Sequence, residues 1–300
     1  MTESIYNAAY SIWNFLIEIA INLMSTSPKT AASGSLYRTA KSLYEAIQDI
    51  SLPIAIIFFL IAIYRDVVGT PPEQQARRFM QDALKFCAMI AVLANLWTVM
   101  GYVIQVADGV TDAMVESSTY EKIEVSDDLK SVLEEANESP DVSISFSTFG
   151  EDLKNWMAAW KEHLMSVFLF FIAALVTLVI VFASAISIIG SAFQRIIKPL
   201  AILPFAAITV AMAAGSGEAT RVTNSYLKTF FGLCISGAFM IICIKLGGAL
   251  STNAINISSL ITDDVTLVEK VLLISIQNMT TPIVIAGLVK TADSVLGKFF

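Results

Sequence analysis

The side chains that usually carry catalysis are sparse and isolated in this chain. Its one histidine, His163, stands near Trp156 and Trp160 with no cysteine beside it, so it makes no metal site. All three cysteines lie inside apolar runs, which predicts packing thiols. No phosphate-binding loop is recognisable, and no serine or cysteine nucleophile is paired with a histidine. We therefore predict no enzyme, no catalytic residue, no metal site and no cofactor.

Two other groups of side chains could act on a charged or hydrated ligand. The first group surrounds a Pro-containing apolar segment and consists of Arg195, Lys198, Pro199, Pro204, Arg221 and Lys228. The second group forms a polar face on a predicted helix and consists of Asn95, Thr98, Tyr102 and Gln105. This polar face could line a water-filled path, and it could equally bond to neighbouring helices.

The elements that must position these residues are membrane helices. Hydrophobic residues make up 56% of the chain and charged residues only 15%, against about 25% charged in soluble domains. About 20 apolar residues cross the hydrocarbon as a helix. The sequence therefore predicts an all-α, polytopic helical membrane protein with about five spanning helices, over residues 47–64, 86–107, 164–194, 229–244 and 271–289. The opening "MTES" has no basic flank, which predicts no cleavable signal peptide.

An N-terminal amphipathic helix is expected over residues 5–24. Polar residues recur there every three or four positions, at Asn7, Ser11, Asn14, Glu18 and Asn22. Apolar residues fill another side, at Ile5, Ala8, Ile12, Phe15, Ile19 and Leu23. We expect an interfacial or assembly helix, whose polar stripe could also face a partner or an aqueous path. With the linker that follows, this helix forms a first region, 1–46.

Three further regions follow along the chain. Residues 47–107 hold the first pair of transmembrane helices, and residues 156–300 a hydrophobic core with the Pro-containing segment. Between them, residues 108–155 contain 13 Asp and Glu against 3 Lys. This acidic composition predicts a short helix and solvated loops on the outer side of the membrane. The region serves either as a solvated lid or as a docking surface for an outer component.

The distribution of Lys and Arg predicts the orientation. The short loop 65–78 holds Arg65, Arg77 and Arg78 and is expected in the cytoplasm.

The same rule predicts the course of residues 199–217. If these residues crossed the membrane, every later basic residue would break the positive-inside rule. Re-entry from the cytoplasm instead keeps Arg221, Lys228, Lys290 and Lys298 inside. Pro204 would break a helix by removing a hydrogen bond. We therefore expect a re-entrant hairpin bent near Pro204, with a sixth spanning helix as the alternative and the loop 251–264 facing outward.

One block of sequence resembles a known family. Residues 195–242, "RIIKPLAILPFAAITVAMAAGSGEATRVTNSYLKTFFGLCISGAFMII", are similar to the central part of TrbL-like conjugation proteins, the group that includes the sixth VirB protein. The resemblance covers the basic residue before a Pro-rich segment, the Gly-Ser-Gly turn, the "SYLK" entry and the small-residue helix that follows. Outside this block, the resemblance lies in the order of the segments along the chain.

The resemblance implies a subunit of a conjugative type IV secretion system in the bacterial inner membrane. Such a subunit has no catalytic residues, assembles as a homo-oligomer in lipid, and works with separate ATPases and other secretion components to move DNA bound to its relaxase. Because the net charge is −7, any contact with DNA would be local, at the basic residues of the first group above. Two alternatives remain: a small-molecule secondary transporter whose Pro-broken segment forms the substrate site, and a purely structural membrane scaffold.

Overall fold

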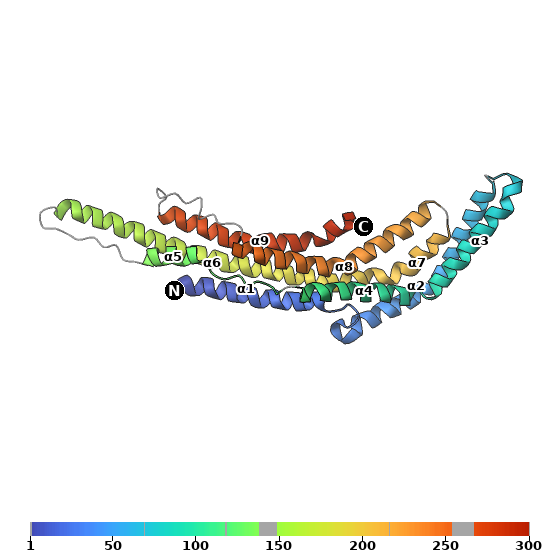
Figure 1. Cartoon of the computed structure of the whole chain (residues 1–300), viewed down its shortest axis with the longest axis horizontal. Helices are drawn as coiled ribbons and strands as arrows, with labels where there is room; N and C mark the ends of the chain where they lie inside the picture. The colour runs from blue at the N-terminus through green and yellow to red at the C-terminus, as the bar shows by residue number, and fades with distance from the viewer. Residues whose placement is uncertain are drawn as a thin grey trace. The chain divides into compact units, whose positions relative to one another are not determined.

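The computed structural model describes residues 2–68, 70–117, 119–137, 149–215, 217–253 and 267–299, and within these ranges it contains helices and no strand (Figure 1). The all-α prediction is confirmed. The long helices are α1 (Thr2–Ser25), α2 (Ser35–Val68), α3 (Pro72–Ala94), α4 (Leu96–Glu116), α6 (Phe149–Ile202), α8 (Glu218–Asn253) and α9 (Leu267–Phe299). The shorter elements are α5 (Asp127–Asn137), α7 (Ala206–Ala211) and the 3-10 turns η1 (Ala31–Gly34), η2 (Leu203–Phe205) and η3 (Met212–Ala214).

The chain divides into two compact units, and each is described by itself. Unit 1 comprises Met1–Ala20, Ser118–Gly190 and Ile242–Lys290. Unit 2 comprises Ile21–Ser117, Ser191–Ile241 and Thr291–Phe300. The boundary predicted after residue 46 falls inside α2, because residues 35–46 continue the helix that carries the first apolar run.

Four helices are long and apolar enough to cross a membrane. They lie within Ala31–Asp66, Trp156–Ala214, Glu218–Leu250 and Leu272–Ala292. A fifth span is possible if α3 and α4 together form one crossing. Large apolar side chains such as Ile57, Leu60 and Tyr64 point outward from α2, as expected of a helix in contact with lipid. The multi-pass class is therefore confirmed, at four to five spans.

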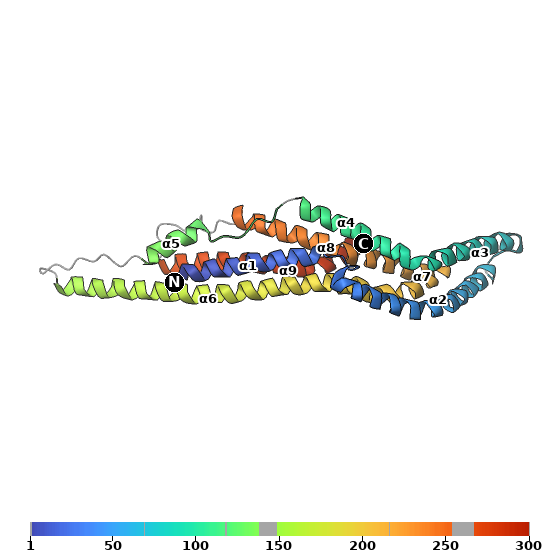
Figure 2. The same ribbon diagram turned by 90° about the horizontal axis from the view of Figure 1, so that it is seen from below.

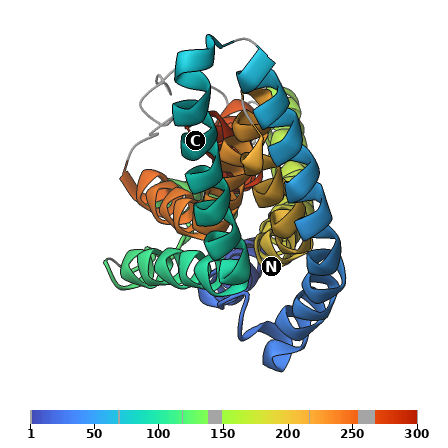
Figure 3. The same ribbon diagram turned by 90° about the vertical axis from the view of Figure 1, so that its right-hand side faces the viewer.

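The predicted helix over residues 86–107 is broken. α3 and α4 meet at a bend of 67°, and Asn95 stands between them with backbone angles φ −110° and ψ 8° (Figures 2 and 3). The Asn95 side-chain amide donates a hydrogen bond of 3.1 Å to the carbonyl oxygen of Ala91. Asparagine offers the backbone such a local partner in place of the helical one, which favours a helix end at this position. Hydropathy alone does not register this break.

The hairpin expected to bend at Pro204 is wrong, because the chain does not reverse there. Residues Trp156–Ala214 form one helical run, tightened into 3-10 geometry at η2 and η3. Pro204 occupies the start of η2, where its missing N–H is tolerated. The Tyr226 hydroxyl donates to the Ile202 carbonyl oxygen at 2.9 Å and supplies a partner at this irregular turn. The Pro-rich segment thus continues the helical run of α6 as far as the turn at Gly215, and the number of times this run crosses the membrane stays a prediction.

The chain reverses instead between Gly215 and Gly217, and α8 runs back from this turn. Gly217 has φ +70°, a left-handed conformation that glycine adopts without strain. A Cβ atom on Gly217 would lie 3.3 Å from the Nη1 atom of Arg65, near the end of α2. The turn therefore lies at the same end of unit 2 as the connection between α2 and α3. The prediction that Arg65 and Arg221 share one side of the membrane gains support, and the side itself stays a prediction.

The core of unit 2 is formed by α2, α3, α4, α7 and the ends of α6 and α8. α7 packs against α2 and α3, which run side by side. Small side chains of the Pro-rich segment make up much of this core: Ala206, Ala207, Val210, Ala211 and Ala214. They allow the helices to approach closely, which is how helices pack in lipid without a hydrophobic driving force.

In unit 1, α1 carries a buried stripe that the sequence pattern did not single out. Its members recur every three or four residues and are Tyr6, Ala9, Tyr10, Trp13, Ile17 and Ala20. The predicted apolar side is instead exposed at Ile12, Phe15 and Ile19, and most of the predicted polar stripe is exposed as well. α1 thus has three faces, which are a buried and largely aromatic stripe, an exposed apolar side and a mostly exposed polar stripe.

The acidic region also differs in extent from the prediction. α4 continues to Glu116 and α6 already begins at Phe149, so both helices enter the predicted range 108–155. The expected short helix is present as α5. Residues 138–148 lie outside the described residues, as does the predicted outward loop 251–264 except for its first three residues, which end α8.

Candidate functional site: a buried arginine in unit 2

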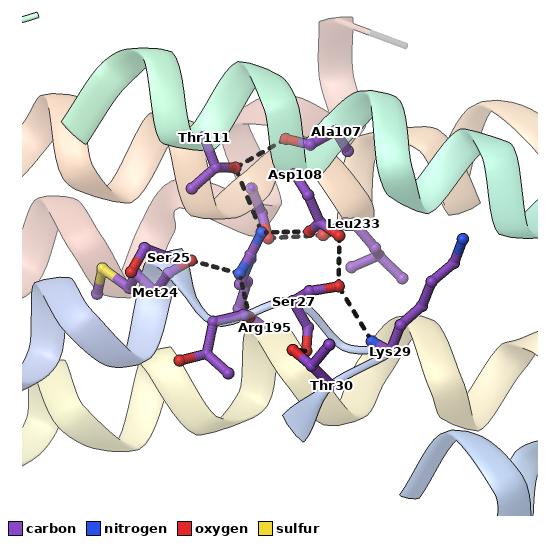
Figure 4. Close-up of polar contacts among 12 residues, drawn as sticks. Met24, Ser25, Ser27, Lys29, Thr30, Ala107, Asp108, Thr111, Arg195 and Leu233 are labelled. Carbon is purple, nitrogen blue, oxygen red and sulfur yellow. Dashed lines mark hydrogen bonds and ion pairs between the residues drawn. The ribbon is translucent and has the colours of Figure 1, made fainter. Parts of the chain in front are cut away.

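Arg195 lies in the interior of unit 2 with 1% of its surface exposed. It was predicted as a basic residue at the end of the third spanning helix, yet α6 continues past it to Ile202. An ionisable residue inside a membrane helix is by default a functional candidate, provided its partner can be named. Here the partners come from the end of α1, from the segment after it and from α4 (Figure 4).

One guanidinium nitrogen of Arg195 closes the C-terminal end of α1. Its Nη1 atom donates to the carbonyl oxygens of Met24 and Thr26, the latter at 2.9 Å. The last carbonyls of a helix have no partner within the helix, and a nearby cation both satisfies them and complements the helix dipole. Arg195 therefore fixes where α1 ends.

The other guanidinium nitrogen binds α4. Its Nη2 atom lies 3.4 Å from Oδ1 of Asp108 and 3.3 Å from Oγ1 of Thr111. Thr111 in turn donates to the carbonyl oxygen of Ala107 at 2.9 Å. Because Asp108 is an acid, the charge of Arg195 is neutralised inside the unit. Asp108 was predicted as part of a solvated acidic region, and this assignment is wrong for its side chain, which is only 14% exposed.

A serine completes the network on the far side of Asp108. The Ser27 hydroxyl donates to Oδ2 of Asp108, and the Ser27 oxygen accepts the backbone N–H of Lys29 at 3.2 Å (Figure 4). Both carboxylate oxygens of Asp108 are thereby hydrogen-bonded. The network ties the connection between α1 and η1 to the same ion pair that holds α4.

Gly237 of α8 leaves the space that the guanidinium occupies. A Cβ atom at Gly237 would lie 2.2 Å from Nε of Arg195 and 2.7 Å from Cζ. The four hydrogen bonds described above prevent the guanidinium from moving aside. Within the described residues, Nε has no hydrogen-bond partner. We refer to Arg195, Asp108, Thr111, Ser27 and Gly237 as the arginine clamp.

The chemistry available to this clamp is structural. Arginine stays protonated and acts here as a set of fixed donors, so it offers no general base or nucleophile. Within the described ranges, no group of three His, Cys, Asp or Glu residues could hold a metal ion. The clamp holds α1, α4, α6 and α8 in one arrangement.

The other residues of the predicted basic group separate into buried and exposed members. Lys198 is partly buried, and Pro199 and Pro204 are buried. Pro199 lies inside α6, where it lacks the N–H that would bind the carbonyl of Arg195. Arg221 and Lys228 are exposed on α8. Arg221 and Lys228 are therefore the members of the group that present their charges most fully at the surface of unit 2.

The predicted polar face lies on the outside of unit 2. Asn95, Thr98, Tyr102 and Gln105 are all exposed. Among the described contacts, Asn95 bonds within its own helix, and no hydrogen bond joins Thr98, Tyr102 or Gln105 to another helix. The structure therefore does not bear out interhelical bonding by this face, and the proposed wet path stays a prediction.

A second polar network lies in unit 1 and joins α1 to α9 and to the segment before α5. The Tyr10 hydroxyl donates to Oδ1 of Asn278 at 2.9 Å, and Trp13 Nε1 donates to the Tyr120 hydroxyl at 2.9 Å. The Asn14 amide donates to the carbonyl of Ile123 at 2.9 Å. Burial raises the pKa of Tyr120 to about 12, against a smaller opposing effect of the hydrogen bond from Trp13. The network docks the aromatic stripe of α1 within its unit.

Sequence reasoning named Arg195 and missed the other members of the clamp, which are Ser27, Asp108, Thr111 and Gly237. A usable signal was present, since the charge-free runs 86–107 and 164–194 are each followed at once by a charge of opposite sign, Asp108 and Arg195. No family profile, no curated protein and no solved structure matches this chain.

Proposed function

We propose that this protein is a membrane-embedded channel and assembly subunit of a conjugative type IV secretion system, located in the bacterial inner membrane. The observation that carries the proposal is the place of the TrbL-like block, residues 195–242. Arg195 at its start is the centre of the arginine clamp, and its Pro-rich segment supplies much of the core of unit 2. The residues that carry the resemblance are therefore the ones on which the packing of this unit depends.

Individual elements of the block have matching physical roles. Tyr226 of the "SYLK" entry donates to the irregular backbone near Pro204. Gly217 of the Gly-Ser-Gly turn supplies the positive φ at the reversal. Gly237 of the small-residue helix makes room for Arg195. Because several residues of the TrbL-like block have a definite packing role, the resemblance supports a shared architecture with that family better than a similar hydropathy profile would.

The proposed role is non-catalytic and depends on assembly. Copies of the chain associate in lipid, other secretion components dock on the assembly, and separate ATPases supply the energy. Burial of Arg195 removes it from the residues that could touch a DNA–relaxase substrate. Contact with such a substrate then depends on exposed basic residues of unit 2, among them Arg65, Arg221 and Lys228.

Deletion of the gene in a donor strain tests the proposal. We expect transfer of a mobilisable plasmid to be lost and to return when the wild-type gene is supplied in trans. Complementation by a Gly190→Ala variant serves as a control, because a Cβ at Gly190 meets no atom within 4 Å. Unchanged transfer after deletion would refute the secretion role. Loss of uptake of a small solute, with transfer intact, would favour the transporter alternative.

A further inference from the structure

A cavity of about 580 Å³ opens at the end of unit 2 where the chain reverses, between α2 and the start of α8. Phe58 and Ile61 of α2 form an apolar wall, and Arg65 lies one turn beyond Ile61. Arg221 of α8 lines the same cavity. The lining thus changes from apolar to cationic along a single helix, which is the order in which a phospholipid presents its chains and its headgroup.

The two arginines are available for a ligand. Both are exposed, and no carboxylate of the described residues lies within salt-bridge distance of either guanidinium. Arg65 stands over the turn, since a Cβ on Gly217 would lie 3.3 Å from its Nη1 atom. Arginine binds phosphate oxygens through two parallel N–H groups, so a pair of arginines favours a phosphate ligand.

The start of α8 adds to the positive potential. α8 has 36 residues, and its first backbone N–H groups point toward the turn at Gly217. Glu218 also lines the cavity and opposes an anion there. Two guanidinium charges and the helix end exceed this single carboxylate, so the cavity keeps a net positive character.

The position along α2 decides between sources of phosphate. The apolar run of α2 ends at Tyr64 and Arg65 is the first charged residue after it, which favours a position of Arg65 near the boundary between hydrocarbon and headgroups. Ile57, Leu60 and Ile61, in the turns before Arg65, are exposed apolar side chains. Basic pockets at this depth between helices suit anionic headgroups. We propose that this cavity binds the phosphate of an anionic glycerophospholipid, with the acyl chains along Phe58 and Ile61.

Native mass spectrometry of the full-length protein in detergent tests the site, with phosphatidylglycerol as the probe and phosphatidylcholine of equal chain length as the reference. We expect preferential binding of phosphatidylglycerol. In the R65A/R221A variant this affinity should fall about tenfold or more, because charge-assisted hydrogen bonds are lost. The R77A/R78A variant removes the same charge from exposed residues of α3 that do not line the cavity, and it should bind like the wild type.

Two further arms keep the test decisive. E218Q removes the opposing carboxylate and should increase the affinity for phosphatidylglycerol, a gain that a misfolded protein would not give. Inorganic phosphate should not displace the lipid. Equal losses in R65A/R221A and R77A/R78A would overturn the proposal by showing a diffuse charge effect. Displacement by inorganic phosphate with the same dependence on Arg65 and Arg221 would assign the cavity to a free anion and overturn the lipid site.

Discussion

At the scale of single residues, the ion pair between Arg195 and Asp108 is the feature whose loss should be felt most. Removing one partner leaves the other charge buried and uncompensated, at a cost of about 3–5 kcal/mol. We expect Asp108→Asn to lower the thermal stability of the detergent-solubilised protein strongly. Asp112→Asn, one turn further along α4 at an exposed position, is the matched control and should change the free energy of unfolding by less than about 0.5 kcal/mol.

A paired substitution separates charge from packing at the same site. Replacing a buried ion pair by apolar residues of similar size is often neutral. The double variant Asp108→Leu with Arg195→Met should therefore recover part of the stability lost in Asp108→Asn, but not all of it, because the carbonyl oxygens of Met24 and Thr26 lose their donor. Equal destabilisation by Asp108→Asn and Asp112→Asn would contradict the role assigned to the pair.

Gly237 gives a second prediction, because a side chain at this position would collide with the guanidinium of Arg195. Gly237→Ala places a methyl group where the guanidinium lies and should destabilise the protein by about 1–3 kcal/mol, the usual range for overpacking. Gly190→Ala makes the same chemical change on α6 with no atom within 4 Å and should be neutral or slightly stabilising. Differential scanning fluorimetry of both variants compares them directly. A stability of Gly237→Ala equal to that of the wild type would show that the guanidinium has room to move.

The pKa of Tyr120 gives a prediction for alkaline pH. Its folded-state pKa of about 12 exceeds the ordinary value of 10.0 because burial disfavours the phenolate. The associated stability is complete below pH 10 and is lost as the pH rises to about 12. Ultraviolet absorbance titration should show a late-ionising phenol in the wild type that is missing from Tyr120→Phe. Loss of a phenol that titrates near pH 10, with the late-ionising phenol retained, would instead place Tyr120 in contact with solvent.

At the scale of elements, the turn between Gly215 and Gly217 predicts a topology. Because this turn and the connection between α2 and α3 lie at the same end of unit 2, cysteines at Glu73 and Glu218 should respond alike to an impermeant maleimide. In a Cys87→Ser background, both should be protected in intact cells and labelled after lysis. A cysteine at Lys122, in the acidic region, should be labelled from outside. Opposite behaviour of the Glu73 and Glu218 positions would contradict the arrangement of α2 and α8.

The helix class and most of the membrane segments could be predicted from composition, because about 20 uncharged apolar residues have few alternatives to a membrane helix. The positions at which helices break could not be predicted from composition. Pro204 looked like a helix terminator, yet a 3-10 turn and the hydroxyl of Tyr226 accommodate it. Asn95 looked like one member of a polar face, yet it ends α3. Both outcomes depend on partners or backbone geometry that a hydropathy pattern does not contain.

The site was predictable to the same limited degree. The sequence identified Arg195 but placed it at an aqueous boundary, since a charge after a long apolar run usually marks the membrane surface. Its burial depends on Asp108, 87 positions earlier in the chain. The stripe of Tyr6, Tyr10 and Trp13 was missed for a related reason, because aromatic residues with polar atoms suit both an interface and a hydrogen-bonded interior.

At the scale of the whole molecule, the exposed apolar face of α1 predicts self-association. Phe15 is 63% exposed on a helix whose opposite face is already packed within unit 1. If copies associate through this face, Phe15→Ser with Ile19→Ser should lower the mass of the purified complex measured by light scattering. Leu43→Ser, at an exposed apolar position of α2, is the control and should leave the mass unchanged. A wild-type protein of monomer mass would contradict the oligomer.

The arginine clamp also has a consequence for how the protein is made. Asp108 leaves the ribosome 87 residues before Arg195, which corresponds to about 4–17 s of translation at about 5–20 residues per second. During that interval α1 and α4 are already synthesised, the last carbonyls of α1 have no guanidinium to bind, and Asp108 lacks the guanidinium of Arg195. The contacts of the arginine clamp therefore cannot form, and α1 and α4 cannot adopt their final packing, until α6 has been synthesised. Translation of α6 thus acts as the step that locks the earlier helices, and a pause before codon 195 would prolong the state most exposed to quality-control proteases.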